Sequence, residues 1–485
     1  MNESSLISRV WDYANILRDS GVSYTDYVSQ LSYLLFLKME SEMGEFNKNT
    51  RSLIPREFSW DTLKRLDGLE LEAAYSRALS ELSRREGIVG TIYQKAQNKI
   101  TEPAKLKRLI SLVDGQTWMG LGVDVKGAIY EGLLEKNATE TKAGAGQYFT
   151  PRVLCESIVA LMRPTPTMSV CDPACGTGGF LLAAYAFMRA QSKDSQVLKA
   201  LREERLYGKD ITPLVVSLCA MNLYLHGLWQ DKALVEEGDS LLELGARRFD
   251  MVLTNPPFGK KSSTKIMGDD GSVKRQSETY TREDFVASTS NKQLNFLQHI
   301  MSLLKMHGRA AVVLPDNVLF EGGAGEKIRR RLLGEFNLHT ILRLPTGIFY
   351  AQGVKANVLF FDKFEPLGSG WRTQRLWVYD LRTNLNLSLV SNPLSREHLS
   401  EFEKCFCAEN SAENFAARVE NERFRCFKID EILARDKTNL DIFWLKDESL
   451  KTLADLASPA EIAREIRADL QGALGEFEFF GKFGG

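Results

Sequence analysis

The sequence predicts an α/β fold: a mostly parallel, doubly wound sheet between a helical N-terminal domain and a helical C-terminal region. Apolar residues recur at helical spacing before about residue 140, and short apolar runs alternate with helical stretches from about 147 to 400. Such alternation is typical of parallel strands with helices on both faces. The length of 485 residues also suggests about three domains. We therefore expect domains at 1–140, 141–400 and 401–485.

The composition narrows the class of protein. The chain is 44% hydrophobic and 26% charged with a formal net charge of −1, so it is not an electrostatic nucleic-acid binder as a whole. Any DNA contact would need local patches or a partner subunit. The seven cysteines form no pair of C-x-x-C motifs, so we expect free thiols in a reducing cytoplasm and no metal site. No signal peptide or membrane span is expected, because the longest apolar patch, near 31–37, is too short.

The N-terminal domain is expected to be helical because its apolar residues share one helical face, for example at Tyr27, Leu31, Leu34, Leu35 and Met39. A stretch rich in small residues, 139–146, follows as a linker or mobile loop. The expected strands of the next domain are 168–171, 205–208, 233–236, 251–254, 310–314, 339–344, 357–361 and 376–380. Helices fit between several of them, at 180–189, 213–228 and 293–305.

A long polar insertion occupies residues 259–291 and contains basic residues together with several Gly and Ser. One interpretation is a solvated or disordered loop. The other is a flexible basic loop that becomes ordered on a phosphate backbone. Its basic residues include Lys260, Lys261, Lys265, Lys274 and Arg275.

The C-terminal region begins its last helix at Ser458, with Pro459 in the first helical position and Glu461 in capping-box register. An apolar stripe at i, i+4 spacing follows. It is interpreted as a face that packs on the core or docks on another chain, and it consists of Ile462, Ile466, Leu470 and Leu474.

Asn255-Pro256-Pro257-Phe258 directly follows the expected strand 251–254. Ligands bind at the carboxyl ends of strands in open α/β sheets. The Asn255 amide oxygen and the Pro256 carbonyl can accept two hydrogen bonds from an exocyclic amine, the prolines restrict the backbone, and Phe258 offers a stacking face. These residues are candidates for holding a flat, amine-bearing base. The alternative is a proline-rich turn with Phe258 in the core.

A second motif, Asp172-Pro173-Ala174-Cys175-Gly176-Thr177-Gly178-Gly179-Phe180, lies between an expected strand and an expected helix. Its glycines permit a tight turn and close approach to a ligand. It lacks the last glycine of the dinucleotide pattern G-x-G-x-x-G, and the charge of Asp172 suits an amine better than a pyrophosphate. S-adenosylmethionine carries both an amine and a sulfonium. The motif can also be a glycine-rich turn without a ligand.

Further candidates end the next two expected strands. Asp210 can accept both ribose hydroxyls of a nucleoside cofactor, or cap the helix that begins near Pro213. Asp239, in Gly238-Asp239-Ser240-Leu241, can contact an adenine amine or simply form a turn. Upstream lies Gly146-Gln147-Tyr148-Phe149-Thr150-Pro151, whose Phe149 and Thr150 can close over the methionine part of the cofactor.

In this order, G-Q-Y-F-T-P, D-P-A-C-G-T-G-G-F, G-D-S-L and N-P-P-F resemble the motifs of S-adenosylmethionine-dependent adenine-N6 DNA methyltransferases. Residues 291–296, 308–317 and 344–349 further resemble the modification (M) subunit of type I restriction-modification systems, and the similarity covers nearly the whole chain. Asp210 departs from the family, which often has Glu there, and its shorter side chain puts its reach to the ribose in doubt.

The resemblance implies a Rossmann-like methyltransferase domain and a role for each candidate. Asp172, Gly176 and Gly178 would hold the methionine end of the cofactor, Asp210 the ribose and Asp239 the adenine. The same site would include Gln147, Tyr148, Phe149, Thr150, Pro173, Thr177, Gly179, Phe180 and Ser240. Asn255 would serve both the cofactor and the target amine, which it would bind together with Pro256, Pro257 and Phe258.

The resemblance also implies partners: double-stranded DNA, a specificity (S) subunit flanked by two copies of this chain, and a restriction (R) subunit in the full complex. The sequence contains no evident helix-turn-helix or zinc finger, so target choice is expected to reside in the S subunit. Three alternatives remain: a protein glutamine-N5 methyltransferase, a nicotinamide-dependent oxidoreductase and a catalytically inactive scaffold subunit.

Overall fold

The computed structural model describes residues 24–46, 52–118, 149–228, 233–258, 263–267, 273–277, 279–349, 353–389, 392–407 and 415–446, and six single residues: Tyr13, Ile16, Leu17, Tyr130, Gly132 and Leu134. Residues 1–443 form one compact unit and residues 444–485 a second. The apolar stripe expected in the last helix, residues 462–474, lies outside the described residues.

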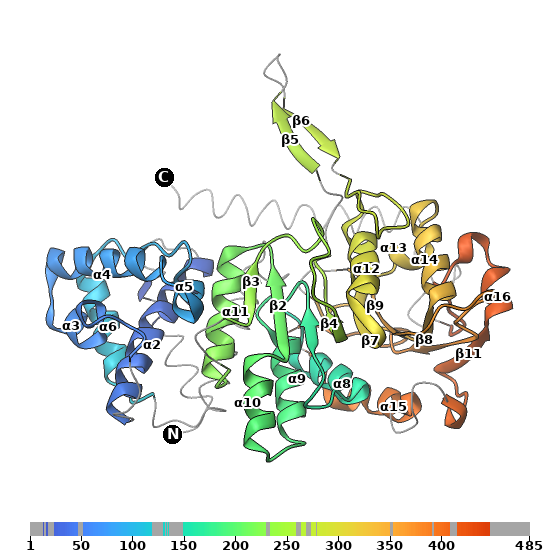
Figure 1. Cartoon of the computed structure of the whole chain (residues 1–485), viewed down its shortest axis with the longest axis horizontal. Coiled ribbons are helices and arrows are strands. Elements are labelled where there is room, and N and C mark those ends of the chain that lie inside the picture. Colours follow the sequence, from blue (N-terminus) through green and yellow to red (C-terminus); the bar gives the residue numbers. More distant parts are fainter. Residues whose placement is uncertain are drawn as a thin grey trace, which may run out of the picture. The chain divides into compact units, whose positions relative to one another are not determined.

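Helices make up the described N-terminal part of the chain (Figure 1). The face expected from Tyr27, Leu31 and Leu34 is buried, and these residues belong to α2. Helix α6 also buries one apolar face. It begins at Pro103, and its buried residues are Leu106, Leu109, Ile110 and Val113. These elements are α2 (Tyr24–Phe46), η1 (Arg56–Phe58), α3 (Trp60–Arg65), α4 (Gly68–Leu82), α5 (Gly87–Tyr93) and α6 (Pro103–Asp114).

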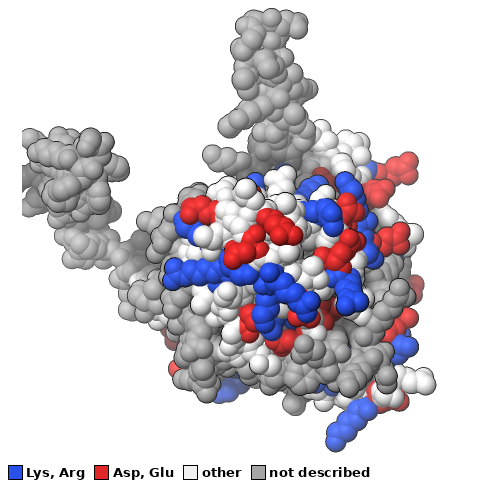
Figure 2. All heavy atoms as spheres, turned by 90° about the vertical axis from the view of Figure 1, so that its left-hand side faces the viewer, with Lys and Arg blue, Asp and Glu red and all other residues white. Residues whose placement is uncertain are grey.

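The surface of this helical part carries charges of both signs. Figure 2 shows basic and acidic side chains interspersed over this side of the molecule, with a group of basic ones across its middle. Several are paired, such as Arg84 with Glu81 at 2.9 Å and Lys105 with Glu102 at 2.7 Å. A mixed face of this kind is a solvated surface and not a continuous phosphate track.

A nine-stranded sheet forms the centre of the fold, in the order β11-β10-β8-β9-β7-β4-β1-β2-β3. All eight expected strands are present, with ends shifted by a few residues. They are β1 (Val170–Asp172), β2 (Leu206–Asp210), β3 (Val235–Glu237), β4 (Phe249–Thr254), β7 (Leu304–Pro315), β8 (Phe336–Arg343), β9 (Ala356–Lys363) and β10 (Arg375–Asp380).

Most neighbouring strands are parallel, as expected. The pairs β1–β2, β1–β4, β2–β3, β4–β7 and β8–β10 are parallel, whereas β9 runs antiparallel between β7 and β8. The chain builds β1, β2 and β3 in one direction and then returns to place β4 on the other side of β1. Such a reversal opens a crevice at the carboxyl ends of β1 and β4, which end at Asp172 and Thr254.

Helices cover both faces of the sheet (Figure 1). Helices α8, α9 and α15 pack together on one face, and α12 and α14 pack on the other against β4, β7 and β8. The helices after residue 150 are α8 (Arg152–Met162), α9 (Gly179–Arg189), α10 (Ser195–Glu203), α11 (Pro213–Leu225), α12 (Lys292–Leu303), α13 (Asn317–Phe320), α14 (Ala324–Glu335), α15 (Arg396–Phe406) and α16 (Ile429–Leu433), with 3-10 turns η3 (Phe415–Ala417) and η4 (Asp436–Thr438).

Three segments differ from expectation. The polar insertion contains a two-stranded antiparallel hairpin, β5 (Ser263–Met267) and β6 (Val273–Ser277). Helix α12 ends at Leu303, because Leu304 adopts an extended conformation and pairs with Phe249 in the sheet. Residues 424–428, expected in a helical region, form β11 (Phe424–Lys428). This strand pairs antiparallel with β10 and is the edge strand at one end of the sheet. In the described part of the chain, no helix has the length and apolarity needed to cross a membrane.

Candidate active site

The turn between β1 and α9 contains the glycine-rich motif of residues 172–180. Gly176 and Gly178 have φ values of +52° and +87°, which favour glycine. A Cβ at Gly178 would lie only 2.9 Å from Sγ of Cys219, so this position also lacks space for a side chain. The turn therefore brings its backbone close to the crevice, as the motif predicts.

Asp172 lies at the end of β1 and is only 2% exposed. Its Oδ1 accepts hydrogen bonds from Thr254 Oγ1 at 2.6 Å and from the backbone N–H of Ala174 at 3.1 Å. Burial raises the pKa of Asp172 to about 7, since these hydrogen bonds only partly offset the loss of water and nearby Asp210 repels the charge. A cationic amine in the crevice would compensate the ionised form.

Asp210 ends β2 beside the same turn. Its Oδ2 accepts from the N–H of Gly176 at 3.2 Å and its Oδ1 from the N–H of Thr212 at 2.9 Å. Burial raises the pKa of this carboxyl group despite those hydrogen bonds. The two roles considered for Asp210 are compatible, because it supports the start of α11 and also lines the cavity described below.

The turn after β3 contains Asp239 and Ser240. Ser240 Oγ donates to the Pro173 carbonyl at 2.6 Å and so ties this turn to the glycine turn. Asp239 Oδ1 accepts from the N–H of Leu241 at 2.8 Å, and its Oδ2 accepts from the Tyr280 hydroxyl at 2.8 Å. Asp239 is thus held at both oxygens.

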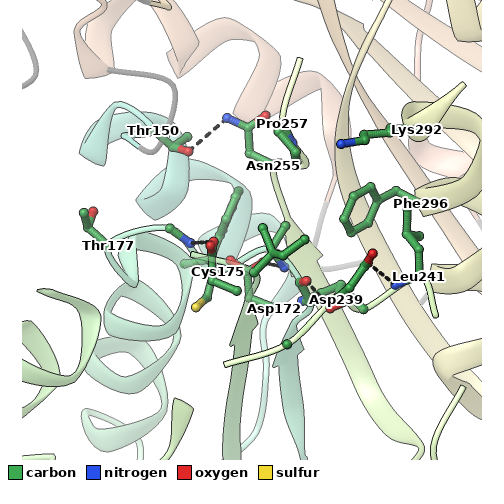
Figure 3. Close-up of a pocket in the computed structure, with 18 of the residues that line it drawn as sticks. Thr150, Asp172, Cys175, Thr177, Asp239, Leu241, Asn255, Pro257, Lys292 and Phe296 are labelled. Atoms are coloured by element: carbon green, nitrogen blue, oxygen red, sulfur yellow. Dashed lines mark hydrogen bonds between the residues drawn. The ribbon is translucent and has the colours of Figure 1, made fainter. Parts of the chain in front are cut away.

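Asn255 follows β4 and faces the cavity (Figure 3). Its Nδ2 donates to Thr150 Oγ1 at 3.0 Å, shown as a dashed line in Figure 3. Its Oδ1 is buried and has no hydrogen-bond partner among the described residues. The amide therefore presents an unused acceptor at the place where the motif predicts one.

The rest of the Asn-Pro-Pro-Phe motif contacts α12 and Phe349. The Pro257 carbonyl accepts from Gln293 Nε2 of α12 at 3.1 Å. Phe258 is half-buried, and its ring meets that of Phe349 edge to face, with centroids 5.1 Å apart and an interplanar angle of 81°. Pro256 lies between Asn255 and Pro257, and its carbonyl oxygen stays a predicted acceptor.

One cavity of about 310 Å³ joins these turns. Of the predicted site residues, it is lined by Thr150, Asp172, Pro173, Gly176, Thr177, Gly179, Phe180, Asp210, Asp239, Ser240, Asn255 and Pro257. Gly178 turns the backbone beside it, and Phe149 is half-buried next to Thr150. Gln147 and Tyr148 lie outside the described residues.

Sequence reasoning missed several lining residues. Ala174, Cys175, Gly238 and Leu241 belong to motifs that were recognised, and Ile211 follows Asp210. Tyr280 comes from the polar insertion. Lys292 and Phe296 come from α12, in the segment 291–296 that resembles the family but was given no role in the site, and Figure 3 shows them opposite Pro257 and Asp239. Lys292 and Phe296 are four residues apart and so share a helix face, which is the signal that could have found them.

The fold and the site together define a Rossmann-like methyltransferase domain of the S-adenosylmethionine-dependent class. A glycine turn, acidic residues at successive strand ends and an Asn-Pro-Pro-Phe motif converge on one cavity at the reversal of strand order. The residues fit that cofactor, because a buried carboxyl group and a close-approaching backbone stand where a methionine amine would bind.

Comparison with known proteins identifies the family. The family described as N-6 DNA Methylase matches residues 122–437, and the HsdM N-terminal domain matches residues 6–113. The chain is 39% identical over 520 residues to the type I restriction enzyme StySPI methylase subunit of Salmonella potsdam, covering 99% of this chain and 95% of that protein. The chain thus belongs to the N-6 DNA methylases and, within them, to the methylase subunits of type I restriction enzymes.

Solved structures of type I restriction-modification proteins resemble this chain over nearly its whole length. The M protein of the type I restriction enzyme EcoKI is 34% identical with a TM-score of 0.52, covering 99% of this chain and 96% of that one. A chain from a study of complex assembly and conformational transition in a type I R-M system has a TM-score of 0.74 at 27% identity, covering 100% and 99%. The matches described here do not support a protein glutamine methyltransferase or a nicotinamide-dependent oxidoreductase.

Proposed function

We propose that this chain transfers a methyl group from S-adenosylmethionine to N6 of an adenine extruded from duplex DNA. The observation that carries the proposal is the buried Oδ1 of Asn255, a lining residue of the cavity, which has no hydrogen-bond partner in the part of the chain that the structure describes. An unsatisfied buried acceptor costs about 1–3 kcal/mol. An exocyclic amine entering the site would donate the missing hydrogen bond, and family membership favours adenine as its source.

The cofactor would bind across the three strand ends. Asp172 would pair with the methionine amine, Gly176 and Gly178 would let the backbone approach it, and Asp210 would accept from the ribose hydroxyls. Asp239 would accept from the adenine amine, opposite Phe296 of α12. When bound, S-adenosylmethionine supplies an electrophilic methyl group on its sulfonium.

The protein's chemical task is to make N6 nucleophilic. The lone pair of this nitrogen is delocalised into the adenine ring. Two acceptors, Asn255 Oδ1 and the Pro256 carbonyl, would bind the two N6 hydrogens and favour a more tetrahedral nitrogen whose lone pair points at the methyl group. Extruding the base costs a few kcal/mol. Stacking on Phe258 would return about 1–3 kcal/mol.

The partners follow from the relatives. The matched proteins are methylase subunits and a chain of a type I R-M complex. We infer that this chain acts on double-stranded DNA with an S subunit that selects the target and is flanked by two copies of this chain. An R subunit would complete the restriction complex. The net charge of −1 is consistent with this division, since the chain as a whole is not strongly basic.

The test is the Asn255→Ala variant, assayed with its S subunit, cognate DNA and radiolabelled cofactor. Methyl transfer to DNA should be lost, whereas cofactor affinity measured by calorimetry should change little. Methyl transfer at the wild-type rate would refute the proposal. A parallel incubation with protein in place of DNA tests the alternative of a protein glutamine methyltransferase. That alternative predicts radiolabel in the protein substrate, whereas the proposal predicts none.

A further inference from the structure

Tyr280 is a lining residue of the cavity that the polar insertion contributes. It lies between β6, which ends at Ser277, and α12, which begins at Lys292. Its hydroxyl donates to Oδ2 of Asp239 at 2.8 Å. Because the N–H of Leu241 donates to Oδ1, each oxygen of the Asp239 carboxylate accepts a hydrogen bond from the protein.

The segment that carries Tyr280 is itself attached to the same turn. Arg282 Nη1 lies 3.4 Å from the carbonyl oxygens of both Ser240 and Leu241 and 3.1 Å from Nδ1 of His299. Burial lowers the pKa of His299 to about 3, so the ring is neutral and accepts the hydrogen bond. The Arg282 side chain is 6% exposed and also pairs with Asp284 at 2.7 Å. Tyr280 is therefore held beside Asp239 by its neighbours in the chain.

We propose that Tyr280 is a positioning residue of the cofactor site, which orients Asp239 to accept a hydrogen bond from the adenine amine. The inference rests on the proposed function, because it presumes an adenine-bearing cofactor at Asp239. Each carboxylate oxygen has two lone pairs, so Asp239 can accept from the ligand while it keeps both protein donors. Without the Tyr280 hydroxyl, Asp239 would gain rotational freedom that the ligand must remove.

This role predicts an effect on cofactor binding and not on methyl transfer. Asp239 follows β3, whereas Asn255 follows β4, and β1 and β2 lie between these strands in the sheet. Tyr280→Phe should raise the Kd and the KM for S-adenosylmethionine about 5- to 10-fold, the size expected for the net contribution of one ordinary hydrogen bond. The kcat at saturating cofactor should stay within twofold of wild type.

The matched control is Tyr207→Phe. Tyr207 also donates its hydroxyl to a carboxylate, Glu236 Oε2 at 3.0 Å, but it does not line the cofactor cavity. Both variants would be made in the full-length chain, with Kd measured by calorimetry and KM and kcat with the S subunit and DNA. Tyr207→Phe should leave all three values near wild type. An equal loss in both variants would overturn the proposal.

A double-mutant cycle tests the route through Asp239. In an Asp239→Ala background, adding Tyr280→Phe should change Kd less than twofold, because the hydroxyl has no carboxylate left to orient. Additive losses, or a wild-type Kd in Tyr280→Phe, would overturn the positioning role alone. A wild-type protein that binds no S-adenosylmethionine would instead overturn the proposed function and this inference together.

Discussion

The side-chain amide of Asn255 donates from Nδ2 to Thr150 Oγ1 at 3.0 Å, whereas its oxygen has no partner among the residues with described positions. Thr150 precedes α8, 105 residues earlier in the chain. This contact selects one of the two amide orientations, in which the nitrogen faces Thr150 and the oxygen remains available as an acceptor. Thr150 belongs to the first of the four motifs along the chain and Asn255 to the last. Their hydrogen bond therefore sets the orientation of the Asn255 amide.

Thr150→Val keeps the shape of the side chain but removes the oxygen that orients the amide. We expect the single-turnover methylation rate to fall about 10- to 100-fold, because a misdirected amide presents a donor where an acceptor is needed. Thr150→Ser retains the oxygen and should stay within about threefold of wild type. Equal rates for Thr150→Val and wild type would show that the amide does not depend on Thr150.

Phe258→Ala should weaken capture of the extruded base, whereas Phe258→Tyr and Phe258→Trp should be tolerated. Loss of one base–aromatic stack costs about 1–3 kcal/mol, or roughly 5- to 150-fold in kcat/KM for DNA. The cofactor Kd serves as the control and should not change. Steady-state kinetics on cognate DNA would contradict the stacking role if the Ala and Tyr variants behaved alike.

Cofactor affinity should depend on pH through Asp172. Because its pKa is raised to about 7, the carboxyl group of the free protein is largely protonated below that pH, and a cationic amine selects the ionised form. Apparent affinity should therefore rise between pH 5.5 and 7, by roughly tenfold per pH unit well below the pKa. Calorimetry on Asp172→Asn should give weaker binding and a flat profile, and a flat wild-type profile would exclude this coupling.

The same shift affects folding with a definite sign. The folded state keeps the Asp172 proton up to about pH 7, whereas an unfolded Asp loses it near pH 3.9, so the folded state binds more protons in this window. The contribution of Asp172 to stability is therefore fully present below that window and is lost as the pH rises to 7. Urea unfolding of Asp172→Asn should lack this component, seen as a smaller pH dependence than in wild type.

The basic residues of the polar insertion are expected to contact DNA phosphates. Replacing Lys265, Lys274 and Arg275 with Ala should weaken DNA binding by the M–S complex at low salt. The slope of log K against log salt should become shallower by about 0.9 for each lost phosphate contact. Parallel salt dependences for the variant and wild type would favour the solvated-loop interpretation.

The C-terminal stripe of Ile462, Ile466, Leu470 and Leu474 is proposed to dock on the S subunit. A chain ending after Ser458 should bind S-adenosylmethionine normally yet fail to co-elute with the S subunit in gel filtration. Co-elution at the wild-type position would place the docking surface elsewhere.

The sequence predicts the elements whose pattern is local. Strands β1, β2 and β4 are short apolar runs followed by motif residues, so both the strand and the candidate site were found together. Strand β11 was missed because only Phe424 of its five residues is fully buried, and an edge strand of this kind has no apolar pattern to recognise. The hairpin β5–β6 was missed because the insertion is polar and lacks the apolar runs that predict strands.

The site residues that the sequence predicts are also those with a local pattern. Asp172, Asp210, Asp239 and Asn255 each follow a recognisable strand, and the fold brings all four to one cavity. Tyr280 has no such context, because it lies within the insertion and reaches Asp239 only after the chain has folded back from the hairpin β5–β6. Contacts of this kind depend on tertiary structure and leave no periodic trace in the sequence.

Helix α11 has a consequence for how this protein can be divided. Every residue from Val215 to Leu225 is buried, and the helix contacts α2 and α5 as well as β2 and β3. Gln94 donates to the Pro213 carbonyl at 2.7 Å, and Tyr224 donates to Glu40 at 3.2 Å. These two hydrogen bonds add to the apolar contact between α11 and the N-terminal helices. A helix without a polar side cannot face water. The N-terminal helices are therefore a wall of the catalytic core, and a fragment that begins at the motif region should precipitate instead of working as a minimal enzyme.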